Sequence, residues 1–164
     1  MLRKIILYFF LIFLIGCSKD EINSPINGKW EAFSFITSVP VDDNQDGVKN
    51  TDLKKEMECV AMEANFSSNG KFTLESTDIT YDVAVVDGSV VLTPTGCGIQ
   101  TENGNWSLNE SSTILFLEFK VEGNPETTSV NVNIDLSENQ LVFKDLLYKE
   151  KPELISYTIE FKRI

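Results

Sequence analysis

Histidine is absent from this chain of 164 residues, and cysteine occurs only three times. Without histidine, the chain lacks the commonest general base and the commonest zinc ligand in proteins. Serine–histidine–aspartate and cysteine–histidine nucleophile systems are therefore excluded. Carboxylates are abundant, but no spacing singles out a catalytic pair. We therefore expect no enzymatic activity.

Positive charge is also scarce. The chain has 14 lysine and arginine residues against 25 aspartate and glutamate residues, which gives a formal net charge of −11. Nucleic-acid-binding proteins need basic patches that neutralise phosphates, so this composition argues against a nucleic-acid partner. An acidic surface also repels anionic lipid headgroups, whereas it favours solubility and the binding of cations.

No apolar run is long enough to span a membrane, but a shorter one lies near the N-terminus. Arg3 and Lys4 precede an apolar stretch from Ile5 to Ile15, whereas a spanning helix needs about 20 residues. The length fits the apolar part of a secretory signal peptide. Leu14-Ile15-Gly16-Cys17 then resembles a bacterial lipobox, in which the cysteine thiol receives a diacylglyceryl group. The alternatives are an ordinary signal peptide with a chance cysteine and a transmembrane anchor.

The lipobox resemblance divides the chain into three parts. It predicts a signal peptide at residues 1–16, a lipidated tether at 17–26 and one domain at 27–164. Two or more acyl chains, such as palmitate, on Cys17 would anchor the protein firmly in a membrane. Lys19-Asp20-Glu21 resembles the export signal that sends lipoproteins of the Bacteroidota to the cell surface, so the resemblance implies a surface-exposed outer-membrane lipoprotein. A solvated tether with random charges is the alternative.

The two remaining cysteines predict a disulfide. With Cys17 assigned to lipid, Cys59 and Cys97 are left in an oxidising compartment, where an even remainder is typical of a disulfide pair. They lie 38 positions apart, so closing this loop should stabilise the fold by about 3–4 kcal/mol. Two free thiols are the alternative.

Apolar residues alternate with polar ones along most of the chain, as in Val130, Val132, Ile134 and Leu136. This period of two predicts antiparallel strands with one buried face. Strands are expected near 28–37, 60–66, 70–77, 79–86, 89–93, 102–108, 113–121, 128–136, 140–146 and 154–163. A short helix is expected at 52–58 and a flexible connection at 93–98. Many short antiparallel strands in one domain indicate an all-β barrel or sandwich.

Two glycine–x–tryptophan motifs, Gly28 with Trp30 and Gly104 with Trp106, each open a strand. Their order, with the segments 68–72 and 139–143, resembles the lipocalin-like lipoproteins of the Bacteroidota. The resemblance covers about residues 26–163 and implies an antiparallel up-and-down β-barrel of about 8–10 strands. It gives a fold and a location, and leaves the ligand-binding residues unknown.

A lipocalin-like barrel suggests two functions. The first is binding of a small apolar ligand inside the barrel. The second is a structural or protein-interaction role in the cell envelope, with a barrel that side chains fill. An eight-stranded barrel can do either. The bulky residues expected to point inward are Trp30, Trp106, Phe116, Phe119 and Phe143.

An acidic segment early in the chain predicts a calcium loop. Asp42, Asn44 and Asp46 are spaced by two and followed by a glycine, as in the first half of an EF-hand loop. The Val48 carbonyl and Asp52 complete the expected ligand set. The twelfth position, where a bidentate glutamate belongs, is leucine, although Glu56 or Glu58 could fold back. A solvated acidic loop without an ion is the alternative.

Overall fold

The structure is a computed structural model that describes residues 23–86, 89–120, 126–147 and 156–164. The expected signal peptide at 1–16, Cys17 and the tether as far as residue 22 lie outside the described residues. Between them the described parts contain nine strands and one short helix. The elements are β1 (Gly28–Val41), β2 (Asn50–Asp52), α2 (Leu53–Glu56), β3 (Met62–Phe66), β4 (Lys71–Val86), β5 (Ser89–Leu108), β6 (Ile114–Lys120), β7 (Thr127–Leu136), β8 (Gln140–Leu147) and β9 (Ser156–Arg163).

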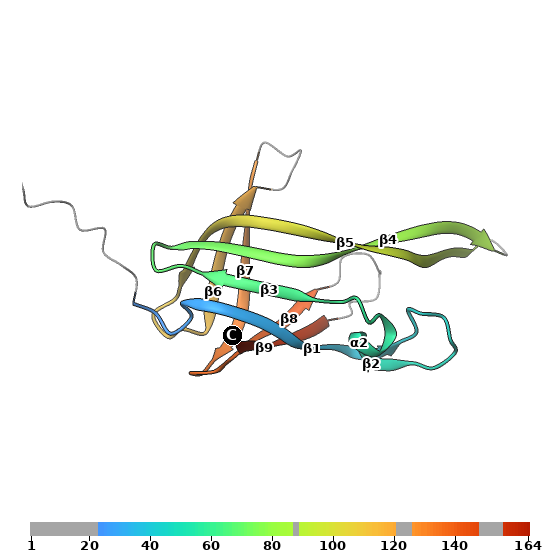
Figure 1. Ribbon diagram of the computed structural model, residues 1–164, viewed down its shortest axis with the longest axis horizontal. Coiled ribbons are helices and arrows are strands. Elements are labelled where there is room, and N and C mark those ends of the chain that lie inside the picture. The colour runs from blue at the N-terminus through green and yellow to red at the C-terminus, as the bar shows by residue number, and fades with distance from the viewer. Residues whose placement is uncertain (1–22, 87–88, 121–125, 148–155) are drawn as a thin grey trace, which may run out of the picture.

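Eight of these strands close into an antiparallel up-and-down barrel, as the sequence predicted (Figure 1). Each strand pairs with the next along the chain from β3 to β9, β1 pairs with β3, and β1 also pairs with β9 to close the ring. The short β2 pairs with β1 outside this ring. Within the barrel, closure gives each strand a partner on both sides, which protects a β protein against edge-to-edge aggregation.

Both tryptophans lie at one end of the barrel, which we call the base. The Trp30 side chain is completely buried, and its indole N–H donates to the Ile26 carbonyl at 2.8 Å. The indole N–H of Trp106 donates to the Ser67 carbonyl at 3.1 Å, and its ring meets Phe66 edge-on. Each indole therefore combines a large buried surface with a satisfied donor, as buried tryptophans require.

The Arg163 side chain closes the base from outside. Its guanidinium lies over the Trp30 ring at 4.3 Å and donates to the carbonyls of Pro25, Asn27 and Glu138. This single residue ties the last strand to the segment before β1. The planar five-donor guanidinium allows it to stack on an aromatic ring and donate in several directions at once.

The two signature glycines are required by local geometry. Gly28 has a φ of +123°, a conformation that side chains rarely adopt. A Cβ on Gly104 would lie 2.0 Å from the backbone oxygen of Glu118 and 2.8 Å from Phe72. At this point β5 and β6 therefore leave no room for a methyl group at position 104.

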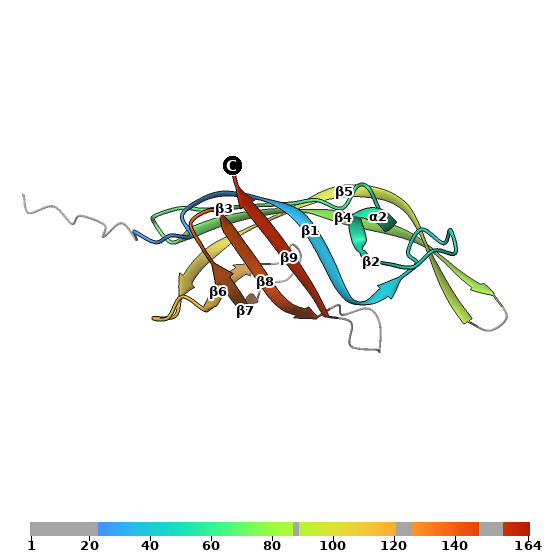
Figure 2. The same cartoon turned by 90° about the horizontal axis from the view of Figure 1, so that it is seen from below.

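The prediction of separate strands at 70–77 and 79–86, and at 89–93 and 102–108, is wrong. Each pair forms one long strand, β4 and β5, which run together as a twisted ribbon past the barrel (Figure 2). The flexible connection expected at 93–98 is therefore strand, apart from a bulge opposite Thr80 and Tyr81. Polar residues break the alternation here because this part of the ribbon has no barrel interior to face.

Two smaller expectations also need correction. The helix is shorter than the expected 52–58, because Asp52 caps its N-terminus and Met57 ends it. Phe116 was expected to point inward, but the buried residues of β6 are its neighbours Leu115 and Leu117, so Phe116 lies on the outer face. The other four bulky residues contribute to the core as predicted.

Candidate functional site

A cavity of about 140 Å³ lies at the far end of the barrel, opposite the base. Strands β1, β3, β4 and β9 form its sides, and α2 with the residues after it forms the remaining wall. Most of the lining is apolar: Phe35, Val41, Leu53, Met57, Val60, Ala61, Met62, Ile79 and Ile159. The other lining residues are Thr37, Asp43, Ser76, Thr77 and Tyr157. The barrel is thus filled by aromatic side chains at its base and hollow at the opposite end.

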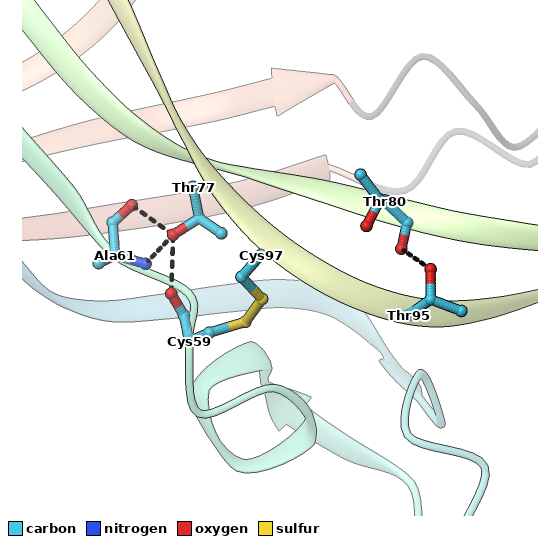
Figure 3. The surroundings of a disulfide bond; sticks show 6 residues. All are labelled: Cys59, Ala61, Thr77, Thr80, Thr95 and Cys97. Atoms are coloured by element: carbon cyan, nitrogen blue, oxygen red, sulfur yellow. Dashed lines mark hydrogen bonds between the residues drawn. A yellow bond between two sulfur atoms is a disulfide. The ribbon is translucent and has the colours of Figure 1, made fainter.

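Residues 57–61, which we call the cap segment, form one wall of the cavity and are held by the β4–β5 ribbon. The predicted disulfide between Cys59 and Cys97 is confirmed, and it joins the cap segment to β5 (Figure 3). The Thr77 hydroxyl lies 2.7 Å from the Cys59 carbonyl and 2.9 Å from the Ala61 amide nitrogen. One covalent bond and a cluster of hydrogen bonds therefore fix this wall.

The helix α2 precedes the cap segment and is tied to two parts of the barrel. Asp52 accepts from the Lys54 amide at 3.1 Å, which satisfies one of the free donors at the helix N-terminus. The Lys54 ammonium donates to the Ala32 carbonyl at 3.3 Å and lies 5.7 Å from the Phe35 ring centre. These contacts dock the helix against β1, so that Leu53 and Met57 face the cavity.

The acidic loop after β1 lies beside this wall, and Glu56 joins the two. The Glu56 side chain is only 4% exposed, and it accepts from the Asp43 amide at 3.1 Å and from the Asn50 side chain at 2.5 Å. Asp43 lies in the loop, and Asn50 is the first residue of β2, where the loop ends. Glu56 is therefore the carboxylate that folds back onto the loop, one of the two alternatives that the sequence left open.

The first three expected calcium ligands each accept a hydrogen bond from a backbone amide of the loop. Asp42 accepts from the Gly47 amide at 3.2 Å, Asn44 from the Asp46 amide at 3.0 Å, and Asp46 from the Val48 amide at 2.7 Å. These bonds from side chains to backbone amides hold the turns of the loop. The other carboxylate oxygen of Asp42 is buried and has no hydrogen-bond partner in the described part of the chain.

The last two expected ligands differ in position. Val48 lies in the loop, where its amide donates to Asp46, whereas the Asp52 carboxylate is engaged at the start of α2. Within the described ranges, no group of three or more acidic, cysteine or histidine side chains has a metal-binding arrangement. An ion at this loop would therefore depend on Asp42, Asp46, the Asn44 amide oxygen and backbone carbonyls, and would require the side chains to rotate.

One further carboxylate lies on the inner face of the barrel. Glu102 lies an even number of positions from Trp106 on β5, so the two side chains point to the same side of the sheet. It pairs with Leu74 of β4, which packs against the core. Burial raises the pKa of the Glu102 carboxyl. Glu102 was not predicted from the sequence, although its position four residues before Trp106 places it on the inward face of a strand.

The cavity residues were not predicted, because the sequence alone left the ligand-binding set unknown. Of the cavity residues on strands, Met62 could have been found by extending the inward parity of β3 from Ala64, but Phe35 could not, because the register of β1 shifts between Ala32 and Ser34 and the parity after Trp30 changes. Those on the cap segment could not, since its position depends on the disulfide and on the contacts of Thr77. Such non-local contacts leave no periodic signal in the sequence.

No family model matches this chain, and no curated protein or solved structure shows significant similarity to it. Membership of the lipocalin-like lipoproteins therefore stays a prediction from the motifs, and the barrel is consistent with a lipocalin-like fold. In the part of the chain that the structure describes, no helix has the length and apolar character needed to cross a membrane.

Proposed function

We propose that this protein binds a small apolar ligand in the cavity at the far end of its barrel. The observation that supports this most is the contrast between the two ends: aromatic side chains fill the base, whereas a cavity of about 140 Å³ remains beneath the cap segment. A barrel with a purely structural role would gain stability by filling this space, because cavities cost packing energy. This contrast favours ligand binding over the alternative of a side-chain-filled interaction module.

The size of the cavity limits the ligand. Drug-sized ligands occupy pockets of about 300–1,000 Å³, whereas an apolar cavity of about 150 Å³ binds benzene. The ligand, or the part of it that is buried, should therefore be comparable to a single ring or a branched chain of about six carbons. At about 0.8 kcal/mol per buried carbon, such a group contributes about 5 kcal/mol, which corresponds to a Kd between about 0.1 and 1 mM.

Saturation-transfer NMR with toluene and cyclohexanol as probes tests this proposal. Both should bind the wild-type protein, and Val60→Trp should abolish the signal because the indole would occupy the cavity. Glu63→Trp is a matched control, since it places the same side chain on the exposed face of β3. Equal signals from the wild type and Val60→Trp would show that the probes bind elsewhere. No signal from any of the three proteins would contradict the proposal.

We also propose that the protein is a lipoprotein of the outer membrane, exposed at the cell surface and anchored through acyl chains on Cys17. The support is the lipobox-like Leu14–Cys17 and the following Lys19-Asp20-Glu21. Cys17→Ala should abolish incorporation of labelled palmitate, and added protease should cleave the wild-type protein on intact cells. Labelling of the variant at the wild-type level would contradict lipidation, and protection on intact cells would contradict surface exposure.

A calcium ion at the acidic loop is a second proposal, favoured by the buried and unpartnered oxygen of Asp42. An extracellular site of this kind has a Kd of about 10⁻⁴ to 10⁻³ M. With a Kd of about 1 mM, 10 mM calcium should stabilise the fold by about 1.4 kcal/mol and raise the Tm by a few degrees. Asp42→Ala with Asp46→Ala should remove the shift, and magnesium should produce a smaller one. Equal shifts with both metals would indicate a merely acidic loop.

A further inference from the structure

The outer part of the β4–β5 ribbon extends beyond the barrel, and among the described residues no further strand pairs with either of its edges there (Figures 1 and 2). The partner of β4 on one side, β3, begins at Met62 opposite Ser76, so β4 has no strand on that side from Thr77 onward in the described structure. The Val85 side chain is 71% exposed, and that of Ile99 is 81% exposed. Two-stranded ribbons are marginally stable in water, so a long projecting one is a candidate interaction surface.

Hydrogen bonds at the barrel end of β4 establish which backbone groups point outward. The Lys71 carbonyl accepts from Ser67 and the Thr77 amide donates to Ala61, so odd-numbered residues point away from β5. The Thr80 carbonyl accepts from Thr95 of β5, so even-numbered residues point toward it. Because these directions alternate along a strand, the N–H and C=O groups of Tyr81, Val83 and Val85 point toward the free edge.

The two free edges of the ribbon differ. On β5, Pro94 pairs with Tyr81 at a position whose backbone faces outward, and proline has no N–H to offer there. The β5 edge also contains the bulge, and both features are known to protect edges against an added strand. Residues 77–86 of β4 contain no proline, glycine or lysine. The edge of β4 is therefore left competent for pairing, whereas that of β5 is blocked.

The sequence from β4 through β6 has charge of one sign between its end lysines. No lysine or arginine occurs between Lys71 and Lys120, whereas seven acidic residues do: Glu75, Asp78, Asp82, Asp87, Glu102, Glu110 and Glu118. Asp78 and Asp82 lie on β4 with exposed side chains. Like charges directly opposite each other destabilise a strand pair, so this edge is poorly suited to a second copy of itself. Opposite charges stabilise a strand pair, so the acidic edge of β4 suits a basic segment.

We infer that the free edge of β4, from Thr80 to Val86, binds an extended segment of another protein in which apolar and basic residues alternate. The segment would add as a strand, with backbone hydrogen bonds to Tyr81, Val83 and Val85 and with its basic side chains near Asp78 and Asp82. Backbone pairing supplies affinity in such β-augmentation, and side-chain charge supplies selectivity. This interface is separate from the ligand cavity, which lies inside the barrel.

The probe is a ten-residue peptide of alternating valine and lysine, with binding measured by fluorescence anisotropy on the purified protein. Val83→Pro removes one outward N–H of β4 and leaves the β4–β5 hydrogen bonds in place, so affinity should fall by about tenfold or more. Leu92→Pro is the matched control, because it pairs with Val83 and faces the opposite edge. It should bind the peptide as the wild type does.

Charge is tested separately with a valine–glutamate peptide and with the double variant Asp78→Asn, Asp82→Asn. The glutamate peptide should not bind, and the double variant should bind the lysine peptide more weakly and with a shallower salt dependence. Three results would overturn the inference: no binding of the lysine peptide by the wild type, equal loss in Val83→Pro and Leu92→Pro, or equal binding of both peptides. Concentration-dependent dimerisation in sedimentation velocity that Val83→Pro removes would also overturn it, by assigning the edge to a second copy.

Discussion

The disulfide between Cys59 and Cys97 should contribute a large part of the stability of this domain. It closes a loop of 38 residues, which in the chain-entropy model stabilises the folded state by about 3.9 kcal/mol at 25 °C. Replacing both cysteines with serine should therefore lower the free energy of unfolding by about 4 kcal/mol. For a domain of this size, a loss of that magnitude lowers the Tm by roughly 8–16 °C.

Urea unfolding followed by tryptophan fluorescence measures the change, with the reduced wild-type protein as a second route to the same state. The m-value should rise slightly, because an unfolded chain without the crosslink exposes more surface. The cap segment should keep much of its hydrogen-exchange protection, since Thr77 still holds Cys59 and Ala61. A stability loss below about 1 kcal/mol with selective loss of protection at the cap would refute the reasoning, because the crosslink would then act only locally.

Three further predictions concern single residues. Gly104→Ala should destabilise the fold by about 3 kcal/mol, because the added methyl group meets a backbone oxygen. The control Gly98→Ala, whose methyl group would have no atom closer than 3.7 Å, should change the free energy of unfolding little. Urea unfolding compares the two variants. Arg163→Ala should cost about 2 kcal/mol in the same assay, through the lost carbonyl contacts and the uncovered Trp30 ring. The pKa of the Glu102 carboxyl is raised in the folded state, so the folded state binds the carboxyl proton more tightly than the unfolded state does. The protonated carboxyl therefore contributes to stability below the ordinary pKa of 4.5, and this contribution is lost as pH rises through the folded-state pKa. Glu102→Gln should therefore be more stable than the wild type at pH 7, and thermal melts should show the difference vanishing below pH 4.5.

The barrel could be predicted from the sequence because its interior imposes a period of two on the strands. The alternation in β7 and β9 placed those strands to within about two residues of their observed positions. The same signal failed in the β4–β5 ribbon, where Asp78 and Thr80 are exposed because no barrel interior lies against them. Continuous strands were therefore interpreted as strands with breaks.

The candidate site was only partly predictable, because its walls come from distant parts of the chain. The disulfide followed from counting cysteines, and the acidic loop followed from its spacing. The cavity did not, since it depends on how α2 docks through Lys54 and on how Thr77 binds the cap segment. Arg163 was missed for the same reason: its partners Asn27 and Trp30 lie more than 130 positions away in sequence.

The proposed binding function depends most directly on whether the cavity beneath the cap segment takes up an apolar molecule. A crystal structure of the protein exposed to toluene would test this, since an apolar cavity of this size holds such molecules in place of water. We predict ordered toluene density between Phe35, Val60 and Ile159. Density for ordered water in its place, or a cap segment whose side chains fill the space, would contradict the proposed binding function.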